Sequence, residues 1–210
     1  MPWSHLPWSH WIDLARYWTG TLLVTSLPPA IVYWFIVHPF IGFWRRVGIR
    51  GTFWFLAVFR VVVPTVLYPY RDALLGRDLG LRIPLALLAL PLTVVSAVIS
   101  RKRRRYLDFK TLAGAAELAP ETHGKGLFTE GIYGRMRHPR YVEFTLGLIA
   151  WSLLCDFAGL YLVTVLCLAA LLAIVVVEEK ELRERFGQAY ADYAARVPRF
   201  IPKSLWPKSL

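Results

Sequence analysis

Apolar segments alternate with short polar or basic links along most of the chain. They cover residues 19–37, 52–67, 83–99, 141–154 and 159–177. A helix needs roughly 20 apolar residues to cross a bilayer, and most of these segments come near that length. We therefore predict an all-α fold, a polytopic membrane helix bundle with about five transmembrane helices.

The last two apolar segments predict a helical hairpin. Only the polar break Cys155-Asp156-Phe157 separates them. Pro139 suits the first turn of a helix, because proline gives up an N–H that has no intrahelical partner there. We expect a helix to begin near His138 and the outer ends of the hairpin to return to one membrane face. The segment 141–154 is short, so the hairpin can be partly re-entrant.

We treat the chain as one structural unit in two parts. Residues 1–123 hold an N-terminal aromatic segment, three transmembrane helices and a basic cytosolic loop, and residues 124–210 hold the hairpin and a cytosolic helical tail. Gly187 indicates a bend within the tail. Apolar residues of the tail recur at helical spacing and predict one packed face: Leu182, Phe186, Tyr190 and Tyr193.

Composition and charge agree with a membrane location. Hydrophobic residues make up 56% of the chain, and the mean hydropathy of +0.44 is too high for an ordinary soluble domain. The net charge is +11, and the basic residues cluster beside the apolar segments. We therefore expect these residues to contact anionic lipid headgroups and expect no nucleic-acid partner. The run Arg101–Arg105 places that end of the third helix in the cytosol. The arginine-rich basic content favours a bacterial inner membrane.

Two other features indicate structure rather than chemistry. Cys155 and Cys167 have neither C-x-x-C nor metal-ligand spacing, so we expect them to be structural and predict no metal site. The link 68–82 mixes arginines with aspartates and predicts an ordinary solvated turn.

Arg60 lies near the middle of the second apolar segment. An arginine there costs about 2.5 to 3.5 kcal/mol on insertion scales unless it finds a partner. One hypothesis is that Arg60 faces the bundle and holds an anionic group of a substrate. The alternative is that its side chain snorkels or bonds to a neighbouring helix.

The candidate chemistry lies at the outer ends of the hairpin. Arg137 and His138 adjoin a helix N-terminus, which suits an anion. Glu178 and Glu179 follow the last apolar segment and suit ammonium groups or ribose hydroxyls. S-adenosylmethionine carries both kinds of group. The plainer alternatives are a helix cap for His138 and a solvated boundary for the glutamate pair.

Several groups of residues, in a fixed order, carry a motif: Leu127–Tyr133, Arg137–Val142, Glu178-Glu179, Phe186–Tyr193 and Arg196-Val197-Pro198. Together they resemble the isoprenylcysteine carboxyl methyltransferase and phospholipid methyltransferase group of integral membrane enzymes. The resemblance covers about Gly126 to Pro202.

The resemblance implies an S-adenosylmethionine-dependent methyltransferase. Its acceptor would be a lipophilic or amphiphilic carboxylate, amine headgroup or thiol that enters from the bilayer. No catalytic residue is assigned, because methyl transfer needs no covalent protein intermediate. The cofactor-binding residues implied are Lys125, Gly126, Leu127, Tyr133, Arg137, His138, Pro139, Tyr141, Glu178 and Glu179, and the substrate-binding candidates are Arg60, Glu143, Tyr193 and Arg196.

The chain departs from the family pattern at two positions. Relatives often have a histidine where this chain has Lys125, and they usually have glycine where Glu143 stands. Membrane sterol and enone reductases that use NADPH have a similar R-H-P-x-Y and hairpin and are an alternative, although Arg140 and Glu143 fit their pattern poorly. A non-catalytic membrane accessory protein is the second alternative.

Overall fold

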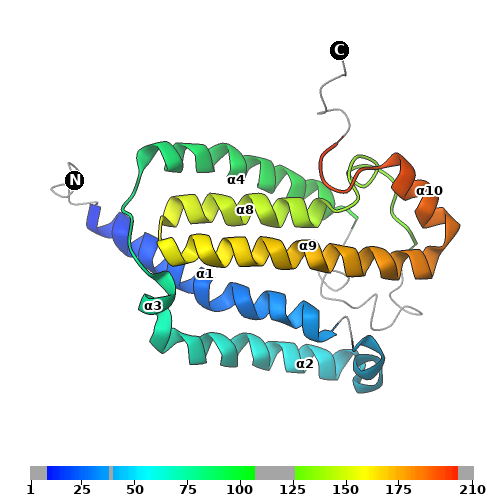
Figure 1. The fold of residues 1–210 in the computed structure, drawn as a ribbon, viewed down its shortest axis with the longest axis horizontal. Coiled ribbons are helices and arrows are strands. Elements are labelled where there is room, and N and C mark those ends of the chain that lie inside the picture. Colours follow the sequence, from blue (N-terminus) through cyan, green and yellow to red (C-terminus); the bar gives the residue numbers. More distant parts are fainter. Residues whose placement is uncertain (1–8, 38–39, 107–125, 203–210) are drawn as a thin grey trace, which may run out of the picture.

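The computed structural model describes residues 9–37, 40–106 and 126–202, and these residues form an all-α membrane helix bundle, as predicted (Figure 1). Among them the only β feature is an isolated bridge between Asp78 and Phe157. The helices are α1 (Ser9–Val37), α2 (Ile41–Leu67), η1 (Tyr68–Tyr70), α3 (Arg71–Leu75), α4 (Ile83–Arg103), α8 (Pro139–Cys155), α9 (Ala158–Phe186) and α10 (Gln188–Arg196).

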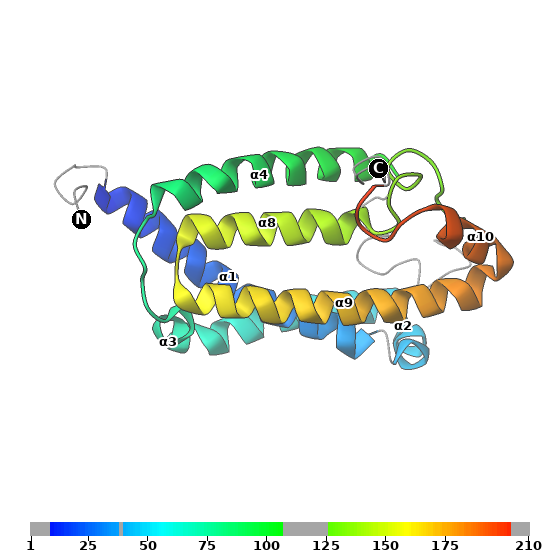
Figure 2. The same cartoon turned by 45° about the horizontal axis from the view of Figure 1, so that its top comes forward.

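The long helices run side by side along the molecule. In Figures 1 and 2, α8 lies between α4 and α9, and α1 and α2 lie on the other side of α9. Helix α8 packs most extensively against α4, whereas α1 packs against both α2 and α9. The core between α1, α8 and α9 includes Tyr141, Leu148, Leu171 and Val175. The hairpin is therefore flanked by α4 and α1, and not by α2.

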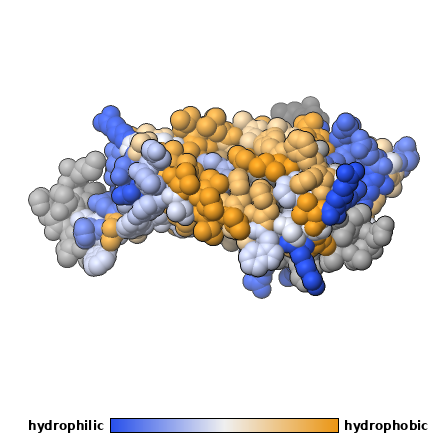
Figure 3. Space-filling model, turned by 90° about the horizontal axis from the view of Figure 1, so that it is seen from below, coloured by the Kyte–Doolittle hydropathy of each residue, from blue (hydrophilic) through white to orange (hydrophobic). Residues whose placement is uncertain are grey.

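The surface matches a membrane-spanning protein. Within the described residues, the segments 42–75, 83–103 and 158–186 are helices long and apolar enough to cross a bilayer. Figure 3 shows an apolar band over the middle of the molecule and polar side chains toward both ends. Helix α8 has 17 residues and is about 26 Å long, slightly less than a hydrocarbon core of about 30 Å. The number of crossings stays a prediction.

The predicted hairpin is confirmed. Helix α8 begins at Pro139 with His138 as its N-cap, and it ends at Cys155. Asp156 adopts the left-handed conformation (φ 57°) that reverses the chain into α9. Helix α9 continues beyond the apolar segment to Phe186, and Gly187 (φ 54°) turns the chain into α10.

The link at residues 68–82 is largely exposed to solvent, as predicted, but it is not an ordinary turn. The link forms η1 and α3, and Leu75 within it is 2% exposed. Its backbone approaches the start of α9 so closely that a Cβ on Gly159 would collide with the carbonyl of Leu74. Several charges of the link remain exposed and also find partners on α1 and on the turn between α8 and α9.

Asp156 is the centre of that charge network and is fully buried. Arg82 donates from Nε and Nη2 to its two carboxylate oxygens at 2.7 and 2.6 Å, and the Tyr161 hydroxyl donates at 2.8 Å. Burial alone raises the pKa of Asp156, but the hydrogen bonds from Arg82 and Tyr161 outweigh it, so this pKa lies below its ordinary value. Arg16 ties α1 to the same turn through the Cys155 carbonyl.

Replacing Asp156→Asn should destabilise the bundle. Asparagine tolerates the left-handed backbone but removes the charge that Arg82 requires, so we expect a melting temperature roughly 3 to 10 °C lower in detergent. Because the folded-state pKa of Asp156 is depressed, its stabilisation is complete above the unfolded-state pKa near 4 and is lost as the pH falls further. The difference between the two proteins should therefore shrink in strong acid.

The exposed Glu184 offers a matched control for that comparison. Glu184→Gln should leave the melting temperature at neutral pH almost unchanged. Equal melting temperatures for wild type and Asp156→Asn would contradict the structural role of Asp156.

Candidate functional site

The outer ends of the hairpin meet at the end of the molecule where α10 lies (Figure 1). His138 Nδ1 lies 3.8 Å from Glu178 Oε2, and His138 Nε2 lies 3.1 Å from Glu179 Oε1. The His138 side chain is 4% exposed. The predicted convergence of the α8 start and the α9 end is thus confirmed.

Glu179 is buried and fully paired. Arg199 donates to its carboxylate from Nε at 3.0 and 3.1 Å and from Nη2 at 2.7 Å. Arg137 Nη2 lies 3.2 Å from Oε1, the oxygen that also contacts His138. The pKa of Arg199 is raised, mainly because its side chain donates a hydrogen bond to Glu179. With these partners in place, the carboxylate has little capacity left for a ligand.

The chain after α10 covers the start of α8. The backbone N–H groups of Arg137 and His138 donate to the carbonyls of Pro198 and Arg199 at 2.9 and 3.0 Å. The sequence led us to expect an anion at this helix terminus, but the tail already accepts these two hydrogen bonds. Sequence analysis also missed Arg199, for which the only signal was a basic residue beside Pro198 in the tail.

Three polar atoms in this region are buried and have no hydrogen-bond partner within the described part of the chain. They are Glu178 Oε2, Arg137 Nε and the Tyr190 hydroxyl. The Arg137 guanidinium lies 6.0 Å from the centre of the Tyr190 ring. Burial raises the pKa of Tyr190, and the charges of Glu179 and Glu178 raise it further. Buried polar groups nearly always have a hydrogen-bond partner. A polar ligand could supply the missing partners of this cation, anion and hydroxyl.

Aromatic side chains border this group on the side of α4. The Tyr133 ring is buried, and its centre lies 6.0 Å from that of Tyr106 and 5.9 Å from that of Phe128. A side chain on Gly131 (φ 59°) would collide with the Tyr106 phenol. The Tyr193 hydroxyl donates to the Tyr133 carbonyl at 2.7 Å, which joins α10 to this loop. The loop before α8 is thereby fixed between α4 and α10.

The other predicted cofactor residues are only partly brought together. Leu127 packs against the buried cluster of Tyr190, Tyr193 and Val197, and Gly126 is exposed. Pro139 is buried at the start of α8. Tyr141 belongs to the core, with its ring 5.7 Å from that of His138. Lys125 lies outside the described residues.

The predicted substrate residues are dispersed. Arg60 is exposed on α2, so the expectation that it faces the interior of the bundle is wrong. Arg196 is exposed on α10, and Tyr193 is buried there. Glu143 is paired with Arg103 of α4 at 2.7 Å. Among the described residues, no group of three or more His, Cys, Asp or Glu side chains could hold a metal ion.

The fold defines a polytopic membrane protein, and buried polar side chains at one end of its helix bundle form a candidate ligand site. A family model described as phospholipid methyltransferase matches residues 84–189, which is half of the chain. The chain belongs to the phospholipid methyltransferase family. The resemblance drawn from its motifs is therefore confirmed.

Similar proteins of known activity fall into two classes. Over 166 residues the chain is 30% identical to Delta(14)-sterol reductase TM7SF2 of Mus musculus, covering 73% of this chain and 40% of that protein. Over 86 residues it is 33% identical to Delta(14)-sterol reductase LBR of Gallus gallus (39% and 13%). Over 114 residues it is 30% identical to Protein-S-isoprenylcysteine O-methyltransferase B of Arabidopsis thaliana (52% and 55%).

The chain therefore spans between 13% and 55% of the length of these relatives. No solved structure matches it.

The pairing of Glu179 predicts that this residue holds the tail in place. Glu179→Gln leaves Arg199 and Arg137 without their carboxylate, so we expect the melting temperature to fall by roughly 3 to 10 °C. Amide hydrogen exchange at Arg137 and His138 should accelerate, because their N–H groups bond to the tail. Exchange measured by mass spectrometry over residues 131–138 tests this directly.

Arg199→Gln should reproduce the effect. The exposed Arg196, which bonds to the Asp192 carbonyl, provides the control. If Arg196→Gln accelerated exchange as much as Arg199→Gln, the assignment of Glu179 to the tail would be wrong.

Proposed function

We propose that this chain is an integral membrane methyltransferase that uses S-adenosylmethionine and acts on a lipophilic or amphiphilic acceptor. One observation carries the proposal. Glu178, Arg137 and Tyr190 each have a buried polar atom without a hydrogen-bond partner among the described residues, while the neighbouring Glu179 is fully paired. Family membership and the methyltransferase relative from Arabidopsis add support.

The residues present fit the proposed cofactor. Arg137 offers a donor to a carboxylate, and Glu178 offers an acceptor to an ammonium group or a ribose hydroxyl. The Tyr190 hydroxyl can donate or accept. Glu179 and His138 position the segments around these groups and do not bind the ligand themselves. Tyr133 and the aromatic side chains beside it supply a wall that excludes water.

When bound, S-adenosylmethionine supplies an electrophilic methyl group on a positively charged sulfur. The chain's own residues then bind and orient the reactants in a site with little water, since the displacement neutralises charge and needs an in-line arrangement. The acceptor reaches such a site from the bilayer. The hairpin packs against α4 and α1 and not against α2, so we propose that the acceptor enters beside α4.

We also propose that this end of the molecule faces the cytosol of a bacterial inner membrane. The basic run Arg101–Arg105 ends α4 beside the start of α8 (Figure 2). The arginines at the start of α2 lie at the same end of the bundle (Figure 1). Clustering of arginines at one membrane face is the usual mark of the cytosolic side.

A second candidate function is an NADPH-dependent sterol or enone reductase. It is favoured by the two sterol reductases among the similar proteins. The family model and the match to an isoprenylcysteine O-methyltransferase favour the methyltransferase instead. A non-catalytic accessory role is the remaining alternative, and it predicts that neither cofactor binds.

Ligand titration of the detergent-purified protein distinguishes these functions. We expect S-adenosylhomocysteine to bind and NADPH not to bind. Glu178→Gln should weaken S-adenosylhomocysteine binding roughly 10- to 100-fold, the usual value of a hydrogen bond to a charged group, with an unchanged melting temperature. Glu184→Gln is the exposed control. Binding of NADPH alone would favour the reductase.

Tyr190 and Tyr193 make a second, matched test. Tyr190→Phe removes a buried hydroxyl that has no partner, so we expect stability to stay the same or rise while S-adenosylhomocysteine affinity falls about 10-fold. Tyr193→Phe removes the hydroxyl that bonds to the Tyr133 carbonyl, so it should lower the melting temperature. Unchanged affinity in Tyr190→Phe would exclude Tyr190 from the ligand site.

A further inference from the structure

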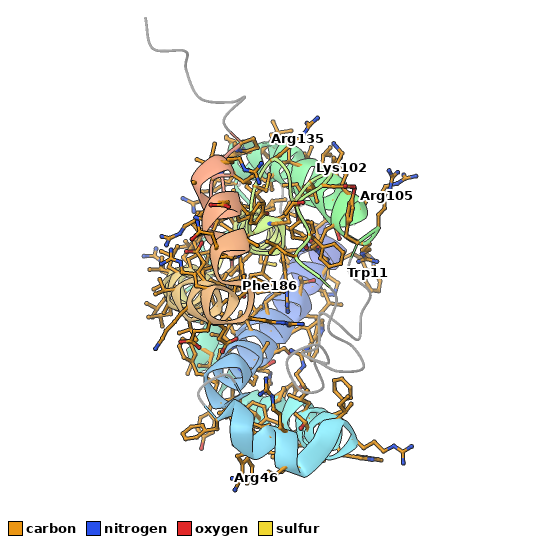
Figure 4. The ribbon with its side chains drawn as sticks, turned by 90° about the vertical axis from the view of Figure 1, so that its right-hand side faces the viewer. Trp11, Arg46, Lys102, Arg105, Arg135 and Phe186 are labelled. Atoms are coloured by element: carbon orange, nitrogen blue, oxygen red, sulfur yellow. The ribbon has the colours of Figure 1, made fainter. Side chains whose placement is uncertain are left out.

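Arg103 differs from the other members of the basic run Arg101–Arg105. Its side chain is 7% exposed, whereas its neighbours in the run are exposed. In Figure 4, Lys102 and Arg105 extend away from the end of α4. The exposed members of the run suit lipid headgroups, but a buried arginine at a membrane face calls for another explanation.

Glu143 holds one side of the Arg103 guanidinium. Arg103 donates from Nε to Glu143 Oε2 at 2.7 Å and from Nη2 to Oε1 at 3.2 Å. Ser96 of α4 donates to the Glu143 backbone carbonyl at 2.9 Å. This bidentate pairing fixes the plane of the guanidinium and leaves its remaining nitrogen to point elsewhere.

That remaining nitrogen, Arg103 Nη1, is buried and has no hydrogen-bond partner among the described residues. A buried donor without a hydrogen-bond partner on a charged group is unfavourable. An ion pair that served only to hold α4 against α8 would not need one. The exposed end of α4 would have allowed this nitrogen to reach water instead. Arg103 is therefore an oriented cation with one hydrogen-bond donor, Nη1, available to a ligand.

Arg103 adjoins the aromatic residues beside the proposed methyl-transfer site, because the Tyr106 backbone N–H donates to the Arg103 carbonyl at 2.9 Å and the Tyr106 ring lies 6.0 Å from that of Tyr133. The positive charge of Arg103 lowers the pKa of Tyr133, while burial and the charge of Glu178 raise it. Tyr133 is therefore within electrostatic reach of both Arg103 and Glu178. Tyr106 and Phe128 surround the same ring and supply apolar surface. A cation beside an aromatic surface at a membrane face suits an amphiphile with an anionic end.

We propose that Arg103, oriented by Glu143, is a specificity-determining residue that binds an anionic oxygen, of a carboxylate or a phosphate, on the methyl acceptor. Arg103 supplies the charge and the hydrogen bond, and Glu143 sets the direction of both. The role as an acceptor site rests on the proposed function, whereas the anion site itself does not. A residue without a carboxylate at position 143 could not provide this orientation.

Binding of amphiphiles with one chain and different headgroups tests the proposal. Palmitate, hexadecyl phosphate and hexadecanol are titrated into the full-length protein in non-ionic detergent. Wild type should bind at least one of the two anionic amphiphiles about 10-fold more tightly than hexadecanol, and the tighter of the two identifies the carboxylate or the phosphate. Arg103→Gln should remove this preference. Arg101→Gln, an exposed change in the same run, should retain it.

Three controls make each outcome decisive. S-adenosylhomocysteine affinity should be the same in all variants, which shows that the fold and the cofactor site are intact. Should Arg103→Gln fail to fold, the double change Arg103→Gln with Glu143→Gln leaves no unpaired charge and should also lack the preference. Arg103→Lys keeps the charge but not the bidentate geometry, and it should reduce the preference several-fold.

Two results would overturn the inference. One is a wild-type protein without any preference for an anionic headgroup, and the other is a preference that survives Arg103→Gln or disappears equally in Arg101→Gln. A protein that prefers anionic amphiphiles through Arg103 but binds no S-adenosylhomocysteine would refute the proposed function and leave the anion site standing. With methyl transfer as the readout, Arg103→Gln should raise KM for the anionic acceptor more than it lowers kcat.

Discussion

A single buried carboxylate, Glu179, organises the end of the bundle where the candidate site lies. A charge at 3% side-chain exposure is stable only if cations and hydrogen-bond donors surround it. Here Arg137 and His138 come from the start of α8, and Arg199 comes from the tail beyond α10. The same contact thus positions three segments that are distant in sequence, and the backbone bonds from Arg137 and His138 to the tail follow from it.

Two adjacent glutamates can play different roles because successive residues on an α-helix point about 100° apart. Glu179 points into the contact between α8 and the tail, where cations saturate it. Glu178 has a 33% exposed side chain and one buried oxygen without a hydrogen-bond partner among the described residues. We therefore propose that one residue of the pair positions the surrounding segments and that the other binds a ligand. This explains why a pair of acidic residues at the end of a membrane helix is compatible with both a structural and a binding role.

The sequence was sufficient for the features that depend on local patterns. The apolar segments, Pro139 and the polar break at Asp156 predicted the hairpin, and the motif predicted that His138 and Glu178 meet. It was not sufficient for partners chosen by tertiary structure. Arg199 reaches Glu179 only because the tail folds back, and Arg103 meets Glu143 across two helices. Such pairs leave no periodicity in the sequence, so the burial of Glu179 and Arg103 could not be predicted from it.

The arrangement also suggests how related chains could accommodate different cofactors. The contacts of Glu179 with Arg199, Arg137 and His138 are made within the chain and need no ligand, so they can stay the same while the ligand changes. The groups left open, Glu178, Tyr190 and Arg103, lie around this frame and can vary independently of it. A family whose frame is separate from its recognition groups can include both methyltransferases and sterol reductases, the two classes of relative that this chain resembles. Identity in the frame residues therefore indicates the fold, and the chemistry must be inferred from the open groups.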